Sequence, residues 1–175
     1  MGKTEETLQL EKSIFRATKK TGVFGCFEVT VGFFGRERVD YMTYDTKGIF
    51  RCYEIKTSVS DFRSKSKNTF CGHYNYYVLT REVYEKVKDE IPKHVGAFVN
   101  GCFYKKPIKQ KLDIPVDVLK DSMIRSLCRE SDKLFNSSDK KALDKAKKTL
   151  EKEKQEVKKL RKELANLKKG DKNAR

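Results

Sequence analysis

Residues 38–56, which read RVDYMTYDTKGIFRCYEIK, decide the fold. Two strand-like runs, 38–44 and 49–57, flank the tetrapeptide Asp45-Thr46-Lys47-Gly48, so this stretch predicts a β-hairpin. Asp at the first position of a turn and Gly at the fourth are typical of type I. If Gly48 is left-handed, the connection is a three-residue loop with a bulge, and residue 45 faces residue 49.

This register brings three charged side chains of the hairpin together. Asp40 faces Glu54, and Arg38 faces Lys56. Because side chains alternate between the two faces of a strand, Asp40, Glu54 and Lys56 project from one side. A turn one residue different would place Asp40 and Glu54 on opposite faces, and a solvated polar face of an edge hairpin is the alternative interpretation.

The facing carboxylates indicate a cation. Like charges opposite each other in a sheet are destabilising, and Mg²⁺, which prefers carboxylate oxygens, would resolve the conflict between Asp40 and Glu54. Lys56 beside them could orient or deprotonate a water on the metal, or offset charge on an attacked phosphate. The hairpin therefore predicts a metal site suited to phosphoryl chemistry.

The rest of the chain predicts helices and strands around this hairpin. Hydrophobic spacing and turn residues indicate further strands at 23–34, 74–79, 95–100 and 102–105, and helices at 1–20, 58–70, 81–90 and 116–130. Asn100-Gly101 is a hairpin turn signal between the last two strands. The order predicts an α/β domain over residues 1–137, with a mixed central β-sheet flanked by helices.

Residues 138–175 differ in composition and predict a basic, heptad-containing helical tail. Positions 139–175 hold 15 Lys and Arg against 7 Asp and Glu, so about half of the net charge of +15 lies there. The heptad seam consists of Leu143, Leu150, Val157 and Leu164, with Ala146, Glu153, Leu160 and Leu167 at the second position. The tail is a solvated helix, an arm that adds affinity for DNA, or a coiled coil over residues 139–169 that forms a homodimer or docks a partner protein.

The composition narrows the function classes. The sequence has no apolar run of the roughly 18–20 residues that cross a bilayer and no apolar signal-peptide core, so no membrane partner is expected. The five cysteines form no CxxC pair, and His73 has no second ligand at zinc spacing, which favours reduced thiols in the cytoplasm. No glycine-rich phosphate loop occurs, so no small-molecule cofactor is expected. The net charge favours nucleic acid as the partner.

Asp40 followed by Glu54-Ile55-Lys56 resembles the D…ExK signature of the PD-(D/E)XK nuclease superfamily. The run from Val39-Asp40 through Tyr53-Glu54-Ile55-Lys56-Thr57-Ser58-Val59-Ser60-Asp61-Phe62 is most similar to its MmcB-like DNA-repair branch and to related phage-encoded proteins. The resemblance covers residues 1–105 and leaves the tail unmatched. Val39 stands where the superfamily signature has Pro.

The resemblance implies a restriction-endonuclease-like core and a metal-dependent DNA nuclease that acts in repair, recombination or phage DNA processing. Asp40 and Glu54 would hold Mg²⁺ or Mn²⁺, and Lys56 would assist the attacking water. A further glutamate completes the site in many members, and Glu28, in an otherwise apolar strand, is preferred here over Glu11. The alternatives are a non-catalytic DNA-binding module on the same fold, assembled through a coiled coil in the tail, and an enzyme of the same chemistry that acts on RNA.

Charged and aromatic residues follow the motif. Arg63, Lys65 and Lys67 could bind phosphates of DNA as a basic ridge, or form a solubilising helix face. Asp61 is expected to offset the helix dipole in the first turn, after a serine N-cap, with a supporting role at the metal site as the alternative. The aromatic run 73–77 predicts strand packing, with stacking on nucleic-acid bases as the alternative.

Overall fold

The computed structural model describes residues 3–33, 35, 37–64, 68–138 and 140–170. The chain consists of two compact units, Met1–Cys128 and Arg129–Arg175. The division lies inside helix α4 (Val116–Ser138), ahead of the change in composition at residue 138.

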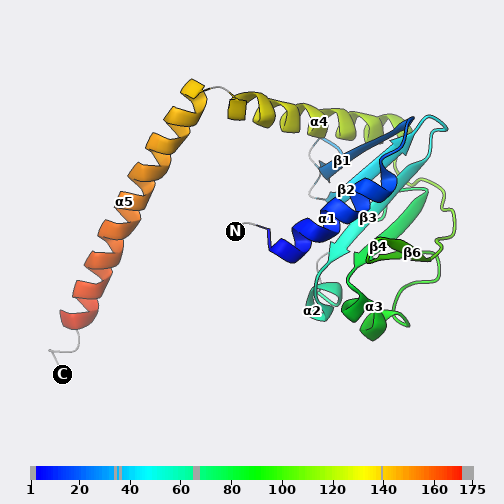
Figure 1. Ribbon diagram of the computed structural model, residues 1–175, viewed down its shortest axis with the longest axis horizontal. Coiled ribbons are helices and arrows are strands. Elements are labelled where there is room, and N and C mark those ends of the chain that lie inside the picture. Colours follow the sequence, from blue (N-terminus) through cyan, green and yellow to red (C-terminus); the bar gives the residue numbers. More distant parts are fainter. Residues whose placement is uncertain (1–2, 34, 36, 65–67, 139, 171–175) are drawn as a thin grey trace. The chain divides into compact units, whose positions relative to one another are not determined.

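A six-stranded mixed sheet forms the centre of the first unit, in the order β1-β2-β3-β4-β5-β6 (Figure 1). Its strands are β1 (Val23–Thr30), β2 (Arg38–Asp45), β3 (Phe50–Lys56), β4 (Tyr74–Leu79), β5 (Gly96–Val99) and β6 (Cys102–Lys105). The neighbours β1, β2 and β3 are antiparallel, β3, β4 and β5 run parallel, and β6 is antiparallel to β5. Helices flank this sheet, so the predicted α/β class with a mixed central sheet is confirmed.

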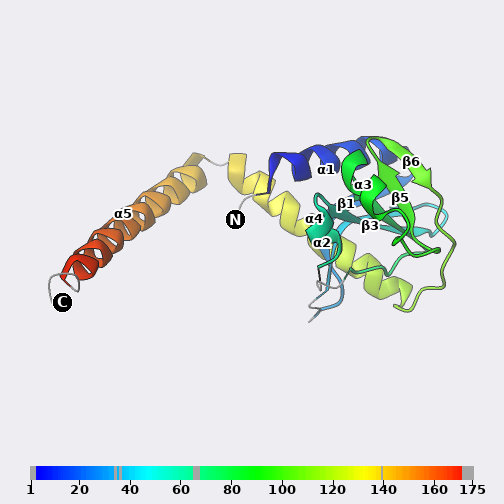
Figure 2. The ribbon, with the colours of Figure 1, turned by 90° about the horizontal axis from the view of Figure 1, so that it is seen from below.

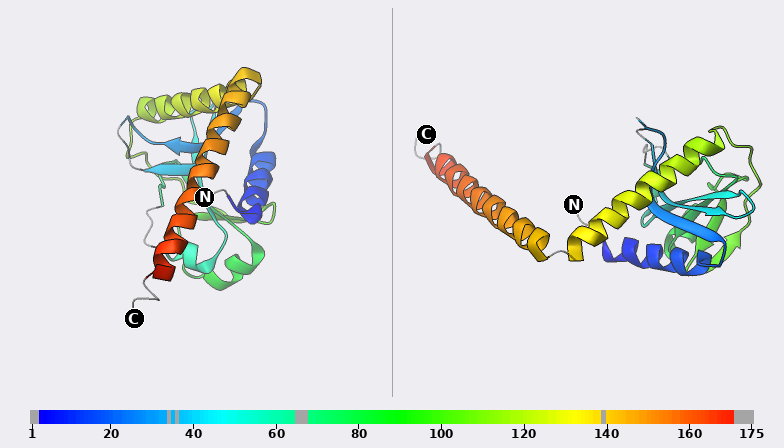
Figure 3. Two further views of the ribbon diagram at one scale, coloured as in Figure 1. Left: turned by 90° about the vertical axis from the view of Figure 1, so that its left-hand side faces the viewer. Right: turned by 90° about the horizontal axis from the view of Figure 1, so that it is seen from above.

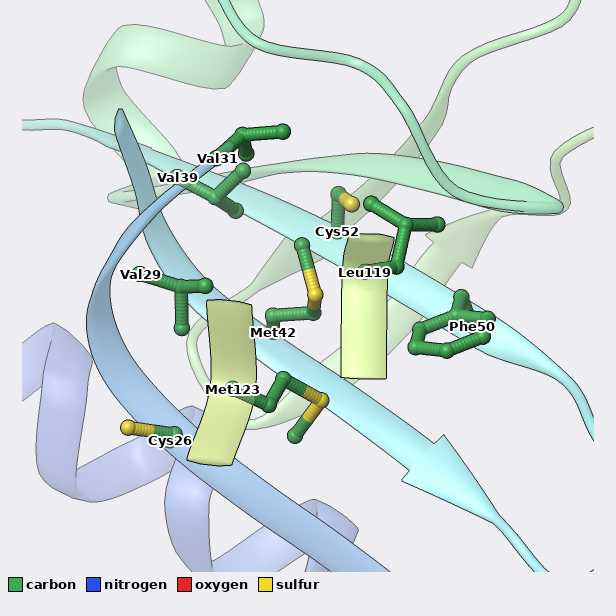
Figure 4. Close-up of a cluster of buried hydrophobic side chains, with 9 residues drawn as sticks. All are labelled: Cys26, Val29, Val31, Val39, Met42, Phe50, Cys52, Leu119 and Met123. Atoms are coloured by element: carbon green, nitrogen blue, oxygen red, sulfur yellow. The ribbon is translucent and has the colours of Figure 1, made fainter. Parts of the chain in front are cut away.

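The two faces of the sheet carry separate hydrophobic cores. On one face, α1 (Glu5–Thr18) buries Leu10 and Ile14 against β2, β3, β4 and β5. On the other face, the first part of α4 buries Leu119 and Met123 against β1, β2 and β3 (Figure 4). Helices α2 (Val59–Phe62) and α3 (Arg81–Val87) cover β4 and β5. Figure 2 shows α1 and α4 on opposite faces, and Figure 3 shows α2 and α3 at the other end of the sheet from α4.

The central hairpin has the predicted turn. The N–H of Gly48 donates to the carbonyl of Asp45 at 2.9 Å, and Gly48 has a φ of 77°. The N–H of Asp45 donates to the carbonyl of Ile49 at 3.1 Å, so residue 45 faces residue 49. The strand pairs that follow keep this register. The hairpin between β5 and β6 also has its predicted turn, because Asn100 and Gly101 both have positive φ.

Several predicted boundaries are wrong, and three of them concern the surroundings of the cavity or the start of the tail. The strand predicted over 23–34 ends at Thr30, because Gly32, with a φ of 76°, turns the chain. Within the described part of the helix predicted over 58–70, only the four-residue α2 is helical, and at Thr69 the chain lies against β3, where its N–H donates to Glu54. The helix predicted over 116–130 continues to Ser138, since no Pro or Gly interrupts it.

The second unit is helical. It comprises the end of α4 and the helix α5 (Lys140–Gly170), which has 31 residues. Across the described part of the chain, no helix is both long enough and apolar enough to span a membrane.

Candidate active site

A cavity of 870 Å³ opens where β2 and β3 approach the N-terminal part of α1. Among the residues that the structure describes, six carboxylates and three cationic side chains line it: Glu11, Glu28, Glu37, Asp40, Glu54 and Asp61, with Lys3, Arg38 and Lys56. The chain as a whole has a net charge of +15, so this local excess of carboxylates is unusual within it. The charge of the lining favours a bound cation.

Asp40, Glu54 and Lys56 all line this cavity, as the hairpin register predicts. Glu54 and Lys56 are buried, at 4% and 6% exposed, and occupy alternate positions of β3, so they share a face. Because β3 lies inside the sheet, between β2 and β4, both side chains project from a rigid element.

Beside the cavity, the side chains of β1 and β2 stop alternating regularly between the two faces of the sheet. In β1, Cys26 and Val29 belong to the same core although they are three residues apart, so the alternation shifts by one residue between them. In β2 the alternation shifts at the same paired position (Figure 4). Glu28 lies at the change in β1 and has a φ of 55°, in the left-handed region that non-glycine residues seldom adopt. The pairing on either side places Asp40 opposite Glu28. This kink gives the rim of the cavity two neighbouring carboxylates.

The ladder between β2 and β3 ends at the pair Tyr41–Tyr53, one rung before Asp40. Beyond it, the N–H of Ile55 donates to Oδ2 of Asp40 at 2.9 Å. A carboxylate therefore accepts the hydrogen bond that a main-chain carbonyl would take in a continuous ladder. This contact satisfies a buried donor and fixes the orientation of Asp40 at the cavity.

The carboxylates of the half-buried Asp40 and the buried Glu54 are difficult to ionise together. Burial, followed by the charge of Asp40, raises the pKa of Glu54 to about 8, while Lys56 and the N–H of Thr69 act in the opposite direction. Burial also raises the pKa of Asp40, and the charge of Glu28 adds to this, although a hydrogen bond from the main chain opposes it. A cation between Asp40 and Glu54 would reverse these effects by favouring the ionised forms.

Lys56 is oriented by helix α2. Its Nζ lies 3.6 Å from Oδ1 of Asp61. Ser58 is the N-cap of α2, and its hydroxyl accepts a hydrogen bond from the N–H of Asp61 at 3.0 Å. Asp61 therefore lies in the first turn, as predicted, and also contacts the buried lysine of the site.

Lys3 contacts both Glu11 and Glu28, the two candidates for the further glutamate of the site. Its Nζ lies 2.8 Å from Oε1 of Glu28 and also contacts Oε1 of Glu11. On the other side, Nε of Arg38 lies 2.7 Å from Oε2 of Glu28. Both glutamates line the cavity, and Glu28, beside Asp40, is held by two cations.

The donor set fits Mg²⁺ or Mn²⁺. Mg²⁺ is usually bound through one or two carboxylates and several waters rather than by a cage of protein ligands. Within residues 3–33, 35, 37–64, 68–138 and 140–170, no group of three His, Cys, Asp or Glu side chains is placed to hold a metal ion. Asp40 and Glu54 would be the protein ligands, and the contribution of Glu28, which lies in ion pairs with Lys3 and Arg38, stays a prediction.

Arg63, the one residue of the predicted basic ridge that the structure describes, is not among the residues that line the cavity. Arg63 makes a two-point ion pair with Glu90, at 3.0 and 2.5 Å, and Lys65 and Lys67 lie outside the described residues. Lys3 and Arg38 are instead the cations that join Lys56 at the cavity. The role of the ridge in binding phosphates stays a prediction.

The aromatic run 73–77 packs within the sheet. Tyr76 stacks on Tyr53 with ring centroids 5.0 Å apart, and Tyr77 is buried. His73 accepts a hydrogen bond from the N–H of Phe50 through Nδ1, at 3.1 Å. These contacts agree with strand packing, the interpretation that the sequence favoured.

Sequence reasoning missed three residues of the site. Arg38 had a signal, because the hairpin register places it opposite Lys56. Lys3 and Thr69 had none, because each reaches the site from a segment that is distant along the chain.

Among known proteins, a solved structure has a similar fold. No family model matches the sequence, and no curated protein matches it significantly. A solved protein of unknown function from Silicibacter pomeroyi is similar to 78% of this chain over 92% of its own length, with a TM-score of 0.58 and 16% sequence identity. At that identity the similarity shows a shared fold alone.

Proposed function

We propose that the chain is a metal-dependent DNA nuclease of the PD-(D/E)XK type, with Mg²⁺ or Mn²⁺ as cofactor. One observation carries the proposal: the buried Glu54 and the half-buried Asp40 share a cavity with the buried Lys56. The pKa of Glu54 is raised to about 8, so ionising both carboxylates is costly without a cation. A divalent cation would remove that cost, which supports a metal site.

Each of the three residues has a role in this proposal. Asp40 and Glu54 would hold the cation, which supplies positive charge at the scissile phosphate and makes a nearby water more acidic. Lys56 would orient the water that attacks phosphorus, or stabilise the negative charge that develops on the phosphate. A new P–O bond forms to the water oxygen, one ester P–O bond breaks, and the leaving oxygen takes a proton. Asp61, near Nζ of Lys56, would position this lysine.

The charge distribution supports a polyanionic substrate. The net charge of +15 favours association with nucleic acid, and Lys3 and Arg38 add cations at the cavity for phosphate contacts. DNA repair, recombination or phage DNA processing are the settings that the sequence resemblance suggests. None of the five cysteines, all of which the structure describes, forms a disulfide, which suits the cytoplasm, the compartment that we propose.

A cleavage panel tests the proposal. Duplex, single-stranded, branched and mismatched DNA, and the corresponding RNAs, are incubated with Mg²⁺, Mn²⁺ or EDTA. We expect cleavage of at least one DNA that requires the cation, and its loss in Glu54→Gln and Lys56→Met. Glu82→Gln is the matched control, because Glu82 is exposed on α3 and outside the cavity.

Binding measured on the same substrates separates the alternatives. Glu54→Gln should keep its affinity for DNA while losing cleavage, because the phosphate contacts remain. If no substrate is cut under any cation but DNA still binds, the non-catalytic DNA-binding module replaces the nuclease. If only RNA is cut, the chemistry stands and the substrate class changes.

A further inference from the structure

Helix α5 carries an exposed apolar stripe at heptad spacing. Leu150, Val157 and Leu160 are 50%, 47% and 56% exposed. Leu150 and Val157 are one heptad apart, and Leu160 follows three residues after Val157, so the three side chains lie on one face of the helix. A stripe of this spacing on an otherwise strongly charged helix is typical of the seam of a two-stranded coiled coil.

The charged residues beside the stripe indicate how a partner helix would run. With Leu150 and Val157 at position a, Glu156 takes position g, and Lys154 and Arg161 take position e. In a parallel pair, a g residue faces the e residue five positions later in the partner, so Glu156 of each chain would face Arg161 of the other. In an antiparallel pair, e positions face e positions, which would place basic side chains against each other.

We propose that α5 pairs with the α5 of a second copy of this chain in a parallel, two-stranded coiled coil. The opposite charges of Glu156 and Arg161 favour a second copy of α5 as the partner helix. In the symmetric pair, each chain supplies an arginine to the other chain's Glu156 and a glutamate to the other chain's Arg161. Val157 at position a and Leu160 at position d are side chains that suit two strands. This inference goes beyond the nuclease proposal and does not depend on it.

Glu153 limits the strength of the pair. It takes position d, between Leu150 and Leu160 along the seam, where it would face the Glu153 of the other chain. A polar seam residue lowers stability and restricts register and the number of strands. We therefore expect a dissociable dimer that Glu153→Leu tightens.

The parallel arrangement has a consequence for the globular units. In each chain α5 follows the globular unit Met1–Cys128 in the sequence. A parallel pair therefore joins the globular units of both chains to the same end of the coiled coil. This consequence alone rests on the proposed function: two globular units that each bind nucleic acid would, linked in this way, bind one polyanion bivalently, with higher apparent affinity than a single unit.

Sedimentation equilibrium of the full chain, over about 1–100 μM and without metal or nucleic acid, tests the pairing. Substituting a buried seam leucine weakens packing in both chains, so Leu160→Gln should raise the dimer dissociation constant at least about a hundredfold. Lys159→Gln is the matched control, because it changes the neighbouring residue, outside the seam, to the same good helix former. A chain that is monomeric throughout, associates only when DNA is added, or dimerises equally with Leu160→Gln would overturn the proposal.

A mixing experiment tests the direction. Glu156→Lys and Arg161→Glu should each dimerise more weakly than the unsubstituted chain, because each variant alone places like charges across the interface. Mixed together, they should form a heterodimer at least about tenfold tighter than either homodimer, since both interchain pairs are then of opposite charge. If the mixture is no tighter than the single variants, the parallel arrangement is wrong.

Discussion

The N–H of Ile55 donates a 2.9 Å hydrogen bond to Oδ2 of Asp40, directly beyond the last paired rung of β2 and β3. The same carboxylate therefore has two roles: it satisfies a buried main-chain donor, and its charge raises the pKa of the neighbouring Glu54. Substituting Asp40 should therefore change both the stability of the fold and the pKa of Glu54.

Asp40→Asn and Asp40→Ala should differ in stability. Asn keeps an oxygen that can accept the hydrogen bond from Ile55, whereas Ala leaves a buried N–H unpaired, at a cost of about 1–3 kcal/mol. We expect Asp40→Asn to unfold at a higher urea concentration than Asp40→Ala. Equal midpoints would show that the hydrogen bond contributes nothing to stability.

Both substitutions should also lower the pKa of Glu54, because each removes the negative charge that helps to raise it. A carboxyl NMR titration of Glu54 in the unsubstituted chain and in Asp40→Asn measures the change. If the pKa of Glu54 is unchanged in Asp40→Asn, the charge of Asp40 does not contribute to raising it.

The free energy of unfolding should fall as the pH rises from about 4.5 to 8 in the absence of divalent cations. The folded chain keeps a proton on Glu54 up to its pKa of about 8, whereas the unfolded chain releases that proton near the ordinary value of 4.5. The folded state binds more protons across this window, so the stability contributed by Glu54 is complete below it and is lost toward its upper end. The slope from this group approaches about 1.4 kcal/mol per pH unit.

Urea unfolding at pH 5, 6, 7 and 8 measures this dependence, and Glu54→Gln isolates it. The amide cannot titrate, so the difference in stability between the two proteins should change with pH in the stated direction. Glu82→Gln, on the exposed surface of α3, should retain the slope of the unsubstituted chain. A slope that persists in Glu54→Gln would have to come from other groups.

Local patterns were sufficient to predict most of the sheet. The turn residues Asp45 and Gly48 fix the register of the central hairpin, and a fixed register decides which side chains share a face. For that reason the sequence could place Asp40, Glu54 and Lys56 at one site before any tertiary contact was known.

The rest of the site depends on tertiary contacts that have no local pattern. Glu28 is an ordinary strand residue in the sequence, and its positive φ arises where β1 and β2 kink together. At the far end of the predicted helix 58–70, the N–H of Thr69 donates to Glu54, a contact that helix propensity cannot report. Lys3 reaches Glu28 only because α1 lies beside the cavity.

The affinity for Mg²⁺ should increase with pH between 6 and 8. The cation competes with the proton on Glu54, so the apparent association constant should rise toward tenfold per pH unit below a pKa of about 8. Isothermal titration calorimetry of the full chain at pH 6, 7 and 8 measures this. In Glu54→Gln both the tight binding and its pH dependence should be lost, and a strong pH dependence that survives would assign it to Asp40.

Lys3→Gln should strengthen Mn²⁺ binding by about two- to fivefold. In the free protein, Nζ of Lys3 neutralises Glu28 and Glu11 at the cavity, and an exposed ion pair of this kind is worth about 0.2–1 kcal/mol. Removing it makes the cavity more negative and releases one of the two cations on Glu28. Lys12→Gln is the matched control, because Lys12 is an exposed lysine of α1 that does not line the cavity. If Lys3→Gln binds Mn²⁺ more weakly, the prediction is wrong. Lys3 would then hold Glu28 in a position from which Glu28 helps to bind the cation.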